Sequence, residues 1–278
     1  MKKLLLFNDT MGSSFDNKKY LESAISNLKE KVTNTKGKLY VEIGEELLKN
    51  NSTTTEIPGF DLDNKKKIVS EFRQDSEILV CINARNIIEN VPLVENGLPC
   101  IDHIELMLKK ISTATWIKPQ IVITHVKIEE MYDLIFSFEK RFQKKGYKVR
   151  ENYLKNSFPD DKKFLLSENW FGNDDHIPFS KKVIFVTSIG NKSGKLDTCV
   201  WQIYRDLWIG IESSFCLLQD TPIQALEANS EEIDQASPQR TFSIIKNLLS
   251  KEVEQDNLIN LYNSEREMTI CPERNKNS

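Results

Sequence analysis

The sequence predicts an α/β protein with a mostly parallel sheet and helices on both of its faces. Short apolar segments alternate with amphipathic helical segments along most of the 278 residues. Such nearly continuous apolar segments are typical of strands that helices cover on both sides. The composition, with 39% hydrophobic and 28% charged residues, is ordinary for a folded globular chain.

The order of the expected elements follows from their periodicity. A helix is expected first, because Leu21, Ile25 and Leu28 recur at helical spacing, and a strand then covers residues 38–43. Further strands are expected at residues 77–83, 120–124, 147–152, 163–168 and 181–188, and helices at residues 101–111, at residues 131–146 and after Gly194. We interpret residues 1–15 as an N-terminal extension, residues 16–220 as the α/β domain and residues 221–278 as a helical C-terminal segment.

Charge and composition exclude several classes of protein. Lys and Arg number 38 and Asp and Glu 41, so the chain lacks the basic excess expected of a nucleic-acid-binding protein. No apolar stretch approaches the length of a membrane span, and the first residues lack the core of a signal peptide. Five scattered cysteines show no metal-binding spacing. We therefore expect a soluble cytoplasmic protein with reduced thiols and no nucleic-acid or membrane partner.

The strongest functional signal is the stretch VIFVTSIGNKSGKLDTCVWQIY, residues 183–204. A phosphate site of this kind needs a buried strand, glycines that let backbone amides converge, a helix N-terminus and a lysine. Gly190 and Gly194 provide the glycines, Lys195 follows directly, and Ser193 adds a hydroxyl and an amide. This pattern predicts a site for a small phosphorylated ligand, such as a nucleotide with Mg²⁺.

The same stretch departs from the standard pattern G-x-x-x-x-G-K-[ST]. Ile189 occupies the place of the first glycine, and Leu196 that of the hydroxyl residue that binds Mg²⁺. Thr198 is the nearby hydroxyl that would replace it, and Asp197 adds a negative charge that competes with a phosphate. The alternative interpretation is a strand-to-helix turn that binds nothing, and the residues alone leave both open.

Two side chains at strand ends are candidates for catalysis or metal binding. Glu168 ends the expected strand 163–168, where a carboxylate would bind Mg²⁺ or take part in catalysis. His125 follows the strand at residues 120–124, so it is a candidate catalytic base or phosphate contact. The alternatives are a solvated glutamate and a structural histidine.

Arg85 and Cys199 are further candidates. Arg85 follows a buried strand, and its planar guanidinium suits a phosphate group. The alternative is that this segment only starts a helix, with Asn83 or Asn86 as its cap. Cys199 lies in the first turns of the loop helix, where the helix dipole would acidify a reactive thiol, unless it simply packs against the sheet.

Six segments together resemble the N-terminal half of the bacterial UPF0371 family, also called the domain of unknown function 1846. They are PGFDLDNKKKIVSEF, EILVCINARNI, IVITHV, FEKRFQKKGYKVRENY, LLSENWFGNDDHI and the glycine stretch. The resemblance implies the α/β fold and a binding loop, but no settled activity. The family's loop pattern, V-T-A-P-G-P-G-S-G-K-M-A-T-C, is matched here at Gly190, Ser193, Gly194, Lys195, Thr198 and Cys199.

Two loop positions and the length depart from that family. Lys192 stands where the family has its middle glycine, and Asp197 where it has an alanine. Family members are longer and have a second half. The leading hypothesis is a phosphate- or nucleotide-binding protein, with Lys195 and the amides of residues 190–194 on the phosphates and any reaction at a phosphate group. The alternative is a non-catalytic interaction or regulatory protein that kept the scaffold, as a homo-oligomer or with a protein partner.

Overall fold

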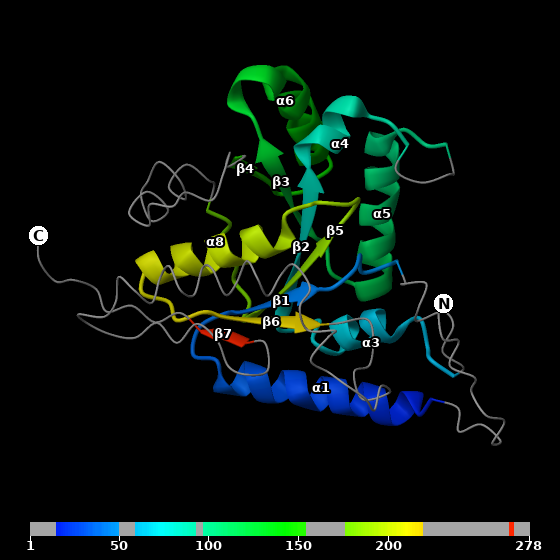
Figure 1. Cartoon of the computed structure of the whole chain (residues 1–278), viewed down its shortest axis with the longest axis vertical. Helices are drawn as coiled ribbons and strands as arrows, with labels where there is room; N and C mark the ends of the chain where they lie inside the picture. The colour runs from blue at the N-terminus through cyan, green and yellow to red at the C-terminus, as the bar shows by residue number, and fades with distance from the viewer. Residues whose placement is uncertain (1–14, 50–58, 93–96, 154–175, 219–266, 270–278) are drawn as a thin grey trace, which may run out of the picture.

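The computed structural model describes residues 15–49, 59–92, 97–153, 176–218 and 267–269. They form one seven-stranded sheet with the strand order β4-β3-β2-β5-β1-β6-β7 (Figure 1). The strands are β1 (Leu39–Ile43), β2 (Ser76–Asn83), β3 (Gln120–Val126), β4 (Val149–Tyr153), β5 (Val183–Ser188), β6 (Ser214–Leu218) and β7 (Glu267–Thr269). The first six pair in parallel, and only β7 is antiparallel to its neighbour.

In the described part of the chain, five helices contribute side chains to the core on one face of the sheet. They are α1 (Asn17–Asn34), α3 (Asn64–Glu71), α4 (Ala84–Glu89), α5 (Cys100–Thr115) and α6 (Ile128–Lys144). Their buried side chains form one core with alternate residues of the strands, among them Leu28 of α1 and Phe142 of α6. Since successive strand residues point to opposite faces, Val41 and Ile43 of β1 belong to this core, while Tyr40 belongs to the other.

The helix α8 (Lys195–Trp208) covers the opposite face (Figure 1). Its buried side chains Cys199, Val200, Trp201 and Ile203 pack against the strands. Near its C-terminal end Asp206, which is fully buried, accepts hydrogen bonds from the Lys38 ammonium (2.6 Å), the Tyr40 hydroxyl (2.8 Å) and the Ser213 hydroxyl (2.6 Å). This carboxylate therefore ties the end of α8 to the start of β1.

The chain reverses its direction across the sheet between β1 and β5. From β1 it passes through α3 to β2, on the far side of β5, and continues to β3 and β4. From β5 it passes through α8, over the other face, to β6 on the far side of β1. The loops after β1 and β5 thus leave in opposite directions, and such a point at the carboxyl ends of parallel strands is where open α/β sheets bind ligands.

The α/β class with a mostly parallel sheet and helices on both faces is confirmed. The expected strand 163–168 lies outside the described residues, as does nearly all of the expected helical segment 221–278. Within that segment the structure describes only Glu267–Thr269, which form the short strand β7 on the edge of β6. The strand β6 was not expected from the sequence.

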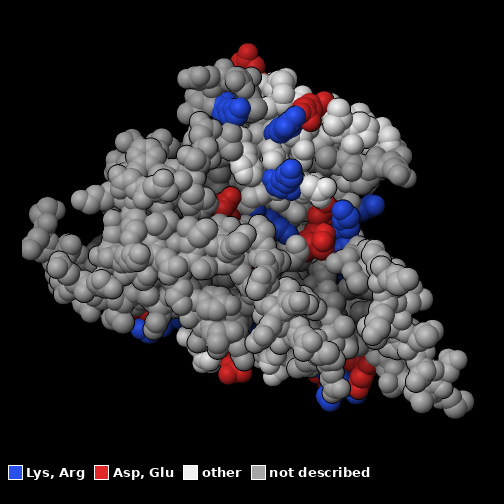
Figure 2. All heavy atoms as spheres, viewed as in Figure 1, with Lys and Arg blue, Asp and Glu red and all other residues white. Residues whose placement is uncertain are grey.

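The described part of the chain contains no helix that is long and apolar enough to cross a membrane. On the face seen in Figure 2, acidic and basic side chains of the described residues lie interspersed. Neither sign forms a continuous patch in that view.

The role of Asp206 predicts a large loss of stability in Asp206→Ala. Removing one partner of a buried ion pair leaves the other charge uncompensated, so we expect the free energy of unfolding to fall by about 3–5 kcal/mol. Glu22→Ala is the control, since its pair with Lys18 is exposed (side chains 68% and 86%) and is expected to contribute about 1 kcal/mol or less. Urea unfolding of both variants measures the difference, and equal losses would contradict the assignment.

Candidate functional site

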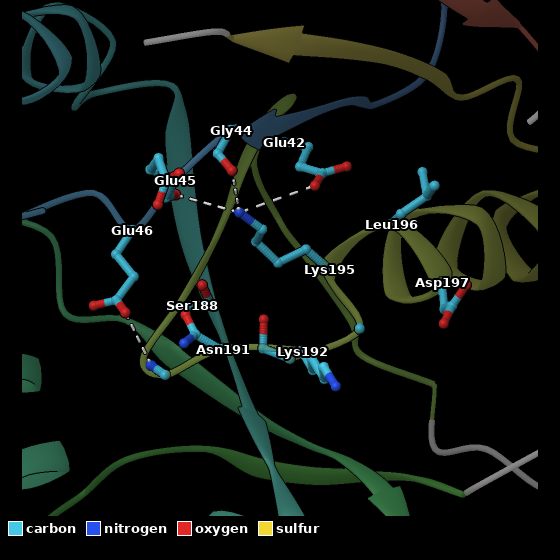
Figure 3. Close-up of a pocket in the computed structure, with 13 residues that line it drawn as sticks. Glu42, Gly44, Glu45, Glu46, Ser188, Asn191, Lys192, Lys195, Leu196 and Asp197 are labelled. Carbon is cyan, nitrogen blue, oxygen red and sulfur yellow. Dashed lines mark hydrogen bonds and ion pairs between the residues drawn. The ribbon is translucent and has the colours of Figure 1, made fainter. Parts of the chain in front are cut away.

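A pocket of about 380 Å³ opens at the carboxyl ends of β1 and β5, where the chain reverses direction (Figure 3). It is lined by residues 42 and 44–46 at the end of β1, and by residues 188 and 190–197 between β5 and α8. The predicted glycine loop therefore forms one wall of this pocket. The other wall consists mostly of glutamates.

The loop between β5 and α8 alternates between left-handed and ordinary backbone conformations. Gly190 has φ 87°, Lys192 φ 52° and Gly194 φ 65°, whereas Asn191 and Ser193 have no positive φ. Such alternation brings successive backbone N–H groups toward one concave side, and this arrangement binds anions in many proteins. The N-terminus of α8, whose first amides have no partner within the helix, follows directly.

Side chains from the ends of β2 and β3 fix the orientation of two peptide groups in the loop. The Asn83 amide donates to the Lys192 carbonyl and the Thr124 hydroxyl to the Ser193 carbonyl, both at 2.8 Å. The described peptide bonds are all trans, so the N–H of each peptide group points opposite to its carbonyl. The amides of Ser193 and Gly194 are thereby turned away from the ends of β2 and β3.

His125 supports the loop through an irregularity in β3. The pairing of β3 with β4 shifts register between Ile123 and Val126, and His125 has φ 58° within this irregularity. A Cβ atom on Gly194 would lie 2.9 Å from Cε1 of His125. Gly194 is therefore required both by its positive φ and by the close approach of this imidazole. His125 lies against the loop, but it is not among the residues that line the pocket.

Lys195 is directed at the end of β1. Its ammonium donates to the carbonyls of Ile43 (2.5 Å), Gly44 (2.9 Å) and Glu45 (3.3 Å) and lies 4.0 Å from the Glu42 carboxylate. These three bonds equal the number of donors that an ammonium has. Lys195 therefore holds the two walls of the pocket together in this structure.

Glu42 is a buried carboxyl group on the pocket wall, with only 6% of the residue exposed. Burial raises its pKa from 4.5 to about 7; the Lys195 ammonium partly opposes this shift, and Asp197 adds to it. Its Oε2 atom is buried and has no hydrogen-bond partner among the described residues. Glu42 therefore differs from an ordinary surface carboxylate in its burial, its raised pKa and its unpaired oxygen.

The lining as a whole carries more acidic than basic side chains. Glu42, Glu45, Glu46 and Asp197 face two lysines, and the Glu46 carboxylate accepts a hydrogen bond from the Gly190 amide at 3.1 Å. Within the described ranges no group of three or more His, Cys, Asp or Glu side chains is placed to hold a metal ion.

The structure places the other predicted residues as follows. Thr198 is fully buried; its hydroxyl donates to the Gly194 carbonyl (2.8 Å) and accepts from the Asn152 amide (3.3 Å). Arg85 is largely exposed on α4 and pairs with Glu89, and it does not line the pocket. Glu168 lies outside the described residues.

Cys199 is buried on the side of α8 that faces the sheet, and burial raises the pKa of its thiol, which supports the packing interpretation over the acidified thiol. Asn83 combines two roles, because its Oδ1 caps α4 at the Arg85 amide while its Nδ2 supports the loop.

Sequence reasoning missed the glutamates of the β1 wall and Thr124. The signal for the glutamates was present, because the strand LYVEI is followed directly by Gly44, Glu45 and Glu46. Acidic residues at the end of a buried parallel strand are candidates for a site. Thr124 gave no comparable signal, because a threonine is ordinary in a strand.

Comparison with known proteins gives consistent matches. The family model described as domain of unknown function DUF1846, N-terminal, matches residues 13–237. A UPF0371 protein of Streptococcus pyogenes serotype M28 is 30% identical over 210 residues, which are 76% of this chain and 42% of that protein. A UPF0371 protein of Streptococcus equi subsp. zooepidemicus is 29% identical over 210 residues, 76% of this chain and 41% of that protein. The chain spans about two fifths of the length of these relatives.

The raised pKa of Glu42 predicts a specific pH dependence of stability. Its contribution is fully present below the unfolded pKa of 4.5 and is lost as the pH rises through about 7, because the folded protein resists ionisation. From pH 4.5 to pH 8 the wild type should lose on the order of 3 kcal/mol relative to Glu42→Gln, at about 1.4 kcal/mol per pKa unit. Urea unfolding across this range measures it, with exposed Glu30→Gln as the control. Parallel curves for wild type and Glu42→Gln would refute the assignment.

The left-handed backbone at Lys192 predicts that glycine is preferred there. We expect Lys192→Gly to unfold with a free energy about 1 kcal/mol higher than Lys192→Ala, because a Cβ in this conformation costs about 1–2 kcal/mol and the flexibility of unfolded glycine offsets part of it. At Lys181, which has no positive φ, the order should reverse. Chemical unfolding of the four variants tests this, and glycine less stable than alanine at both positions would contradict it.

Proposed function

The chain belongs to the family of the N-terminal domain of unknown function DUF1846, and we propose that it binds the phosphate group of a small ligand in the pocket between β1 and β5. The observation that carries the proposal is the alternating backbone of residues 190–194 at the N-terminus of α8. Converging amides and the positive end of a helix dipole both favour an anion.

Preorganisation of the loop supports this proposal. The side chains of Asn83 and Thr124 donate hydrogen bonds to carbonyls of the loop, and His125 packs against Gly194. A loop whose amides are already oriented loses less entropy when it binds an anion.

The charges of the lining indicate how the phosphate would be held. Lys192 is exposed at the rim and is able to reach a ligand, whereas the donors of Lys195 are engaged by backbone carbonyls. We therefore assign the main contacts to the loop amides and Lys192, with Lys195 as the residue that closes the pocket wall. The acidic wall favours a phosphate that arrives together with Mg²⁺, as nucleotides do, because the cation offsets repulsion from Glu45 and Asp197.

A second candidate is a non-catalytic interaction or regulatory protein on the same scaffold. The engaged ammonium of Lys195 and the surplus of carboxylates in the lining favour it, because both oppose a free anion. Catalysis at phosphate, with His125 and Glu168 as the candidate groups, remains a prediction from the sequence.

Thermal unfolding with added ligands separates the two candidates. The purified protein is melted with inorganic phosphate, pyrophosphate, ATP and GTP, each with and without Mg²⁺. A ligand at a hundred times its Kd stabilises the folded state by about 2.7 kcal/mol, which shifts the melting temperature visibly. Lys192→Ala should weaken binding about fivefold, since an exposed charged contact contributes about 1 kcal/mol.

Lys181→Ala is the matched control, because Lys181 is exposed at the opposite end of the sheet, just before β5, and its replacement changes the net charge equally. Binding that is weakened in Lys192→Ala and unchanged in Lys181→Ala supports the pocket. If no ligand changes the melting temperature, the proposed function is wrong and the non-catalytic interaction protein is the better interpretation.

A further inference from the structure

The carboxyl group of Glu42 lies in the wall of the pocket without a full set of hydrogen bonds. In β1 the neighbouring residues Val41 and Ile43 point to the helices of the first face, so Glu42 points to the side of α8. In Figure 3 it lies on the opposite side of the Lys195 ammonium from Glu46.

Lys195 does not satisfy Glu42. The ammonium lies 4.0 Å from Oε1, beyond hydrogen-bond distance, and donates instead to three backbone carbonyls. The other oxygen, Oε2, is buried without a partner in the described part of the chain. An unpaired buried polar atom is costly, and most such atoms in native proteins find a partner. Glu42 lines the pocket, so a ligand bound there would lie next to this carboxyl group.

We propose that Glu42 hydrogen-bonds to a hydroxyl group of the ligand, so that the pocket selects a phosphate ester with a hydroxyl close to its phosphate. This inference rests on the proposed phosphate site, and it adds the chemical class of the ligand. Phosphorylated polyols, sugars and nucleotides belong to this class. Inorganic phosphate and simple alkyl phosphates lack the hydroxyl-bearing carbon chain.

The protonation state of Glu42 should make the preference for a hydroxyl-bearing ligand depend on pH. The charged groups that shift the pKa of this carboxyl are Lys195 and Asp197 of α8. The negative charge of Glu42 in turn raises the pKa of the buried thiols of Cys81 and Cys199. With its pKa raised to about 7, Glu42 gains charge as the pH rises through neutrality. A carboxylate is a stronger acceptor than a neutral carboxylic acid, so the preference for a hydroxyl should grow with pH.

Two phosphate esters with the same number of carbons test the inference. Glycerol 3-phosphate carries two hydroxyls that n-propyl phosphate lacks, and the ionisation of the phosphate itself largely cancels in the ratio of their Kd values. We expect the wild type to bind glycerol 3-phosphate at least about tenfold more tightly at pH 8, measured by calorimetry, because a site that hydrogen-bonds a hydroxyl rejects the analogue without it.

Variants of Glu42 assign the preference to this carboxyl. Glu42→Met keeps the length without an acceptor and should bind both esters equally. Glu42→Gln retains an acceptor, so it should keep part of the preference and lose its dependence on pH between 6 and 8. Glu30→Gln, an exposed change of the same charge on α1, should behave as the wild type. Circular dichroism checks that each variant is folded, and Glu42→Gln decides the question if Glu42→Met is not.

The outcomes separate this inference from the proposed function. Equal binding of both esters by the wild type would leave a phosphate site and overturn the role of Glu42. An unchanged preference in the folded Glu42 variants would overturn it as well. If the wild type binds neither ester but is stabilised by phosphate or a nucleotide, the inference falls while the phosphate site stands; if none of these ligands binds, both fall.

Discussion

The attachment of α8 to β1 at both ends is the interaction on which the rest of the site depends. At one end the buried carboxylate of Asp206 accepts from Lys38 and Tyr40, and at the other the ammonium of Lys195 donates to the carbonyls at the end of β1. Between these two points α8 has little freedom to shift along the sheet. The loop before α8 is therefore held next to β1, although β1 and α8 lie far apart in the sequence.

Two of the four non-glycine residues with positive φ in the described ranges lie at or beside this edge of the sheet, as does one buried carboxyl oxygen without a hydrogen-bond partner. Lys192 and His125 hold left-handed conformations, and Glu42 is buried without a partner for one oxygen. Such features cost free energy and persist where the surrounding structure imposes them, which is typical of functional sites. The rest of the described sheet follows the ordinary rules of parallel α/β packing, with apolar strands covered on both faces.

Part of the site could be predicted because its residues are contiguous. The strand, the two glycines, Lys195 and the following helix lie within residues 183–208, so their local pattern indicated a loop at the end of a strand. The partners of that loop could not be predicted in the same way. Thr124 and Glu46 reach it from β3 and from the loop after β1, and which strands adjoin β5 depends on pairing between distant segments.

The sequence by itself determined the class of fold and most of the strands, because apolar periodicity reports burial on one face or on two. It also determined the position of the glycine loop, since only glycine tolerates the left-handed backbone readily at Gly190 and Gly194. The tertiary structure alone decided where the ammonium of Lys195 points, that Glu42 is buried, and that Thr198 and Cys199 face the core. The physical reason is that hydrogen bonding and desolvation depend on neighbours brought together by the strand order, in which β5 lies between β1 and β2.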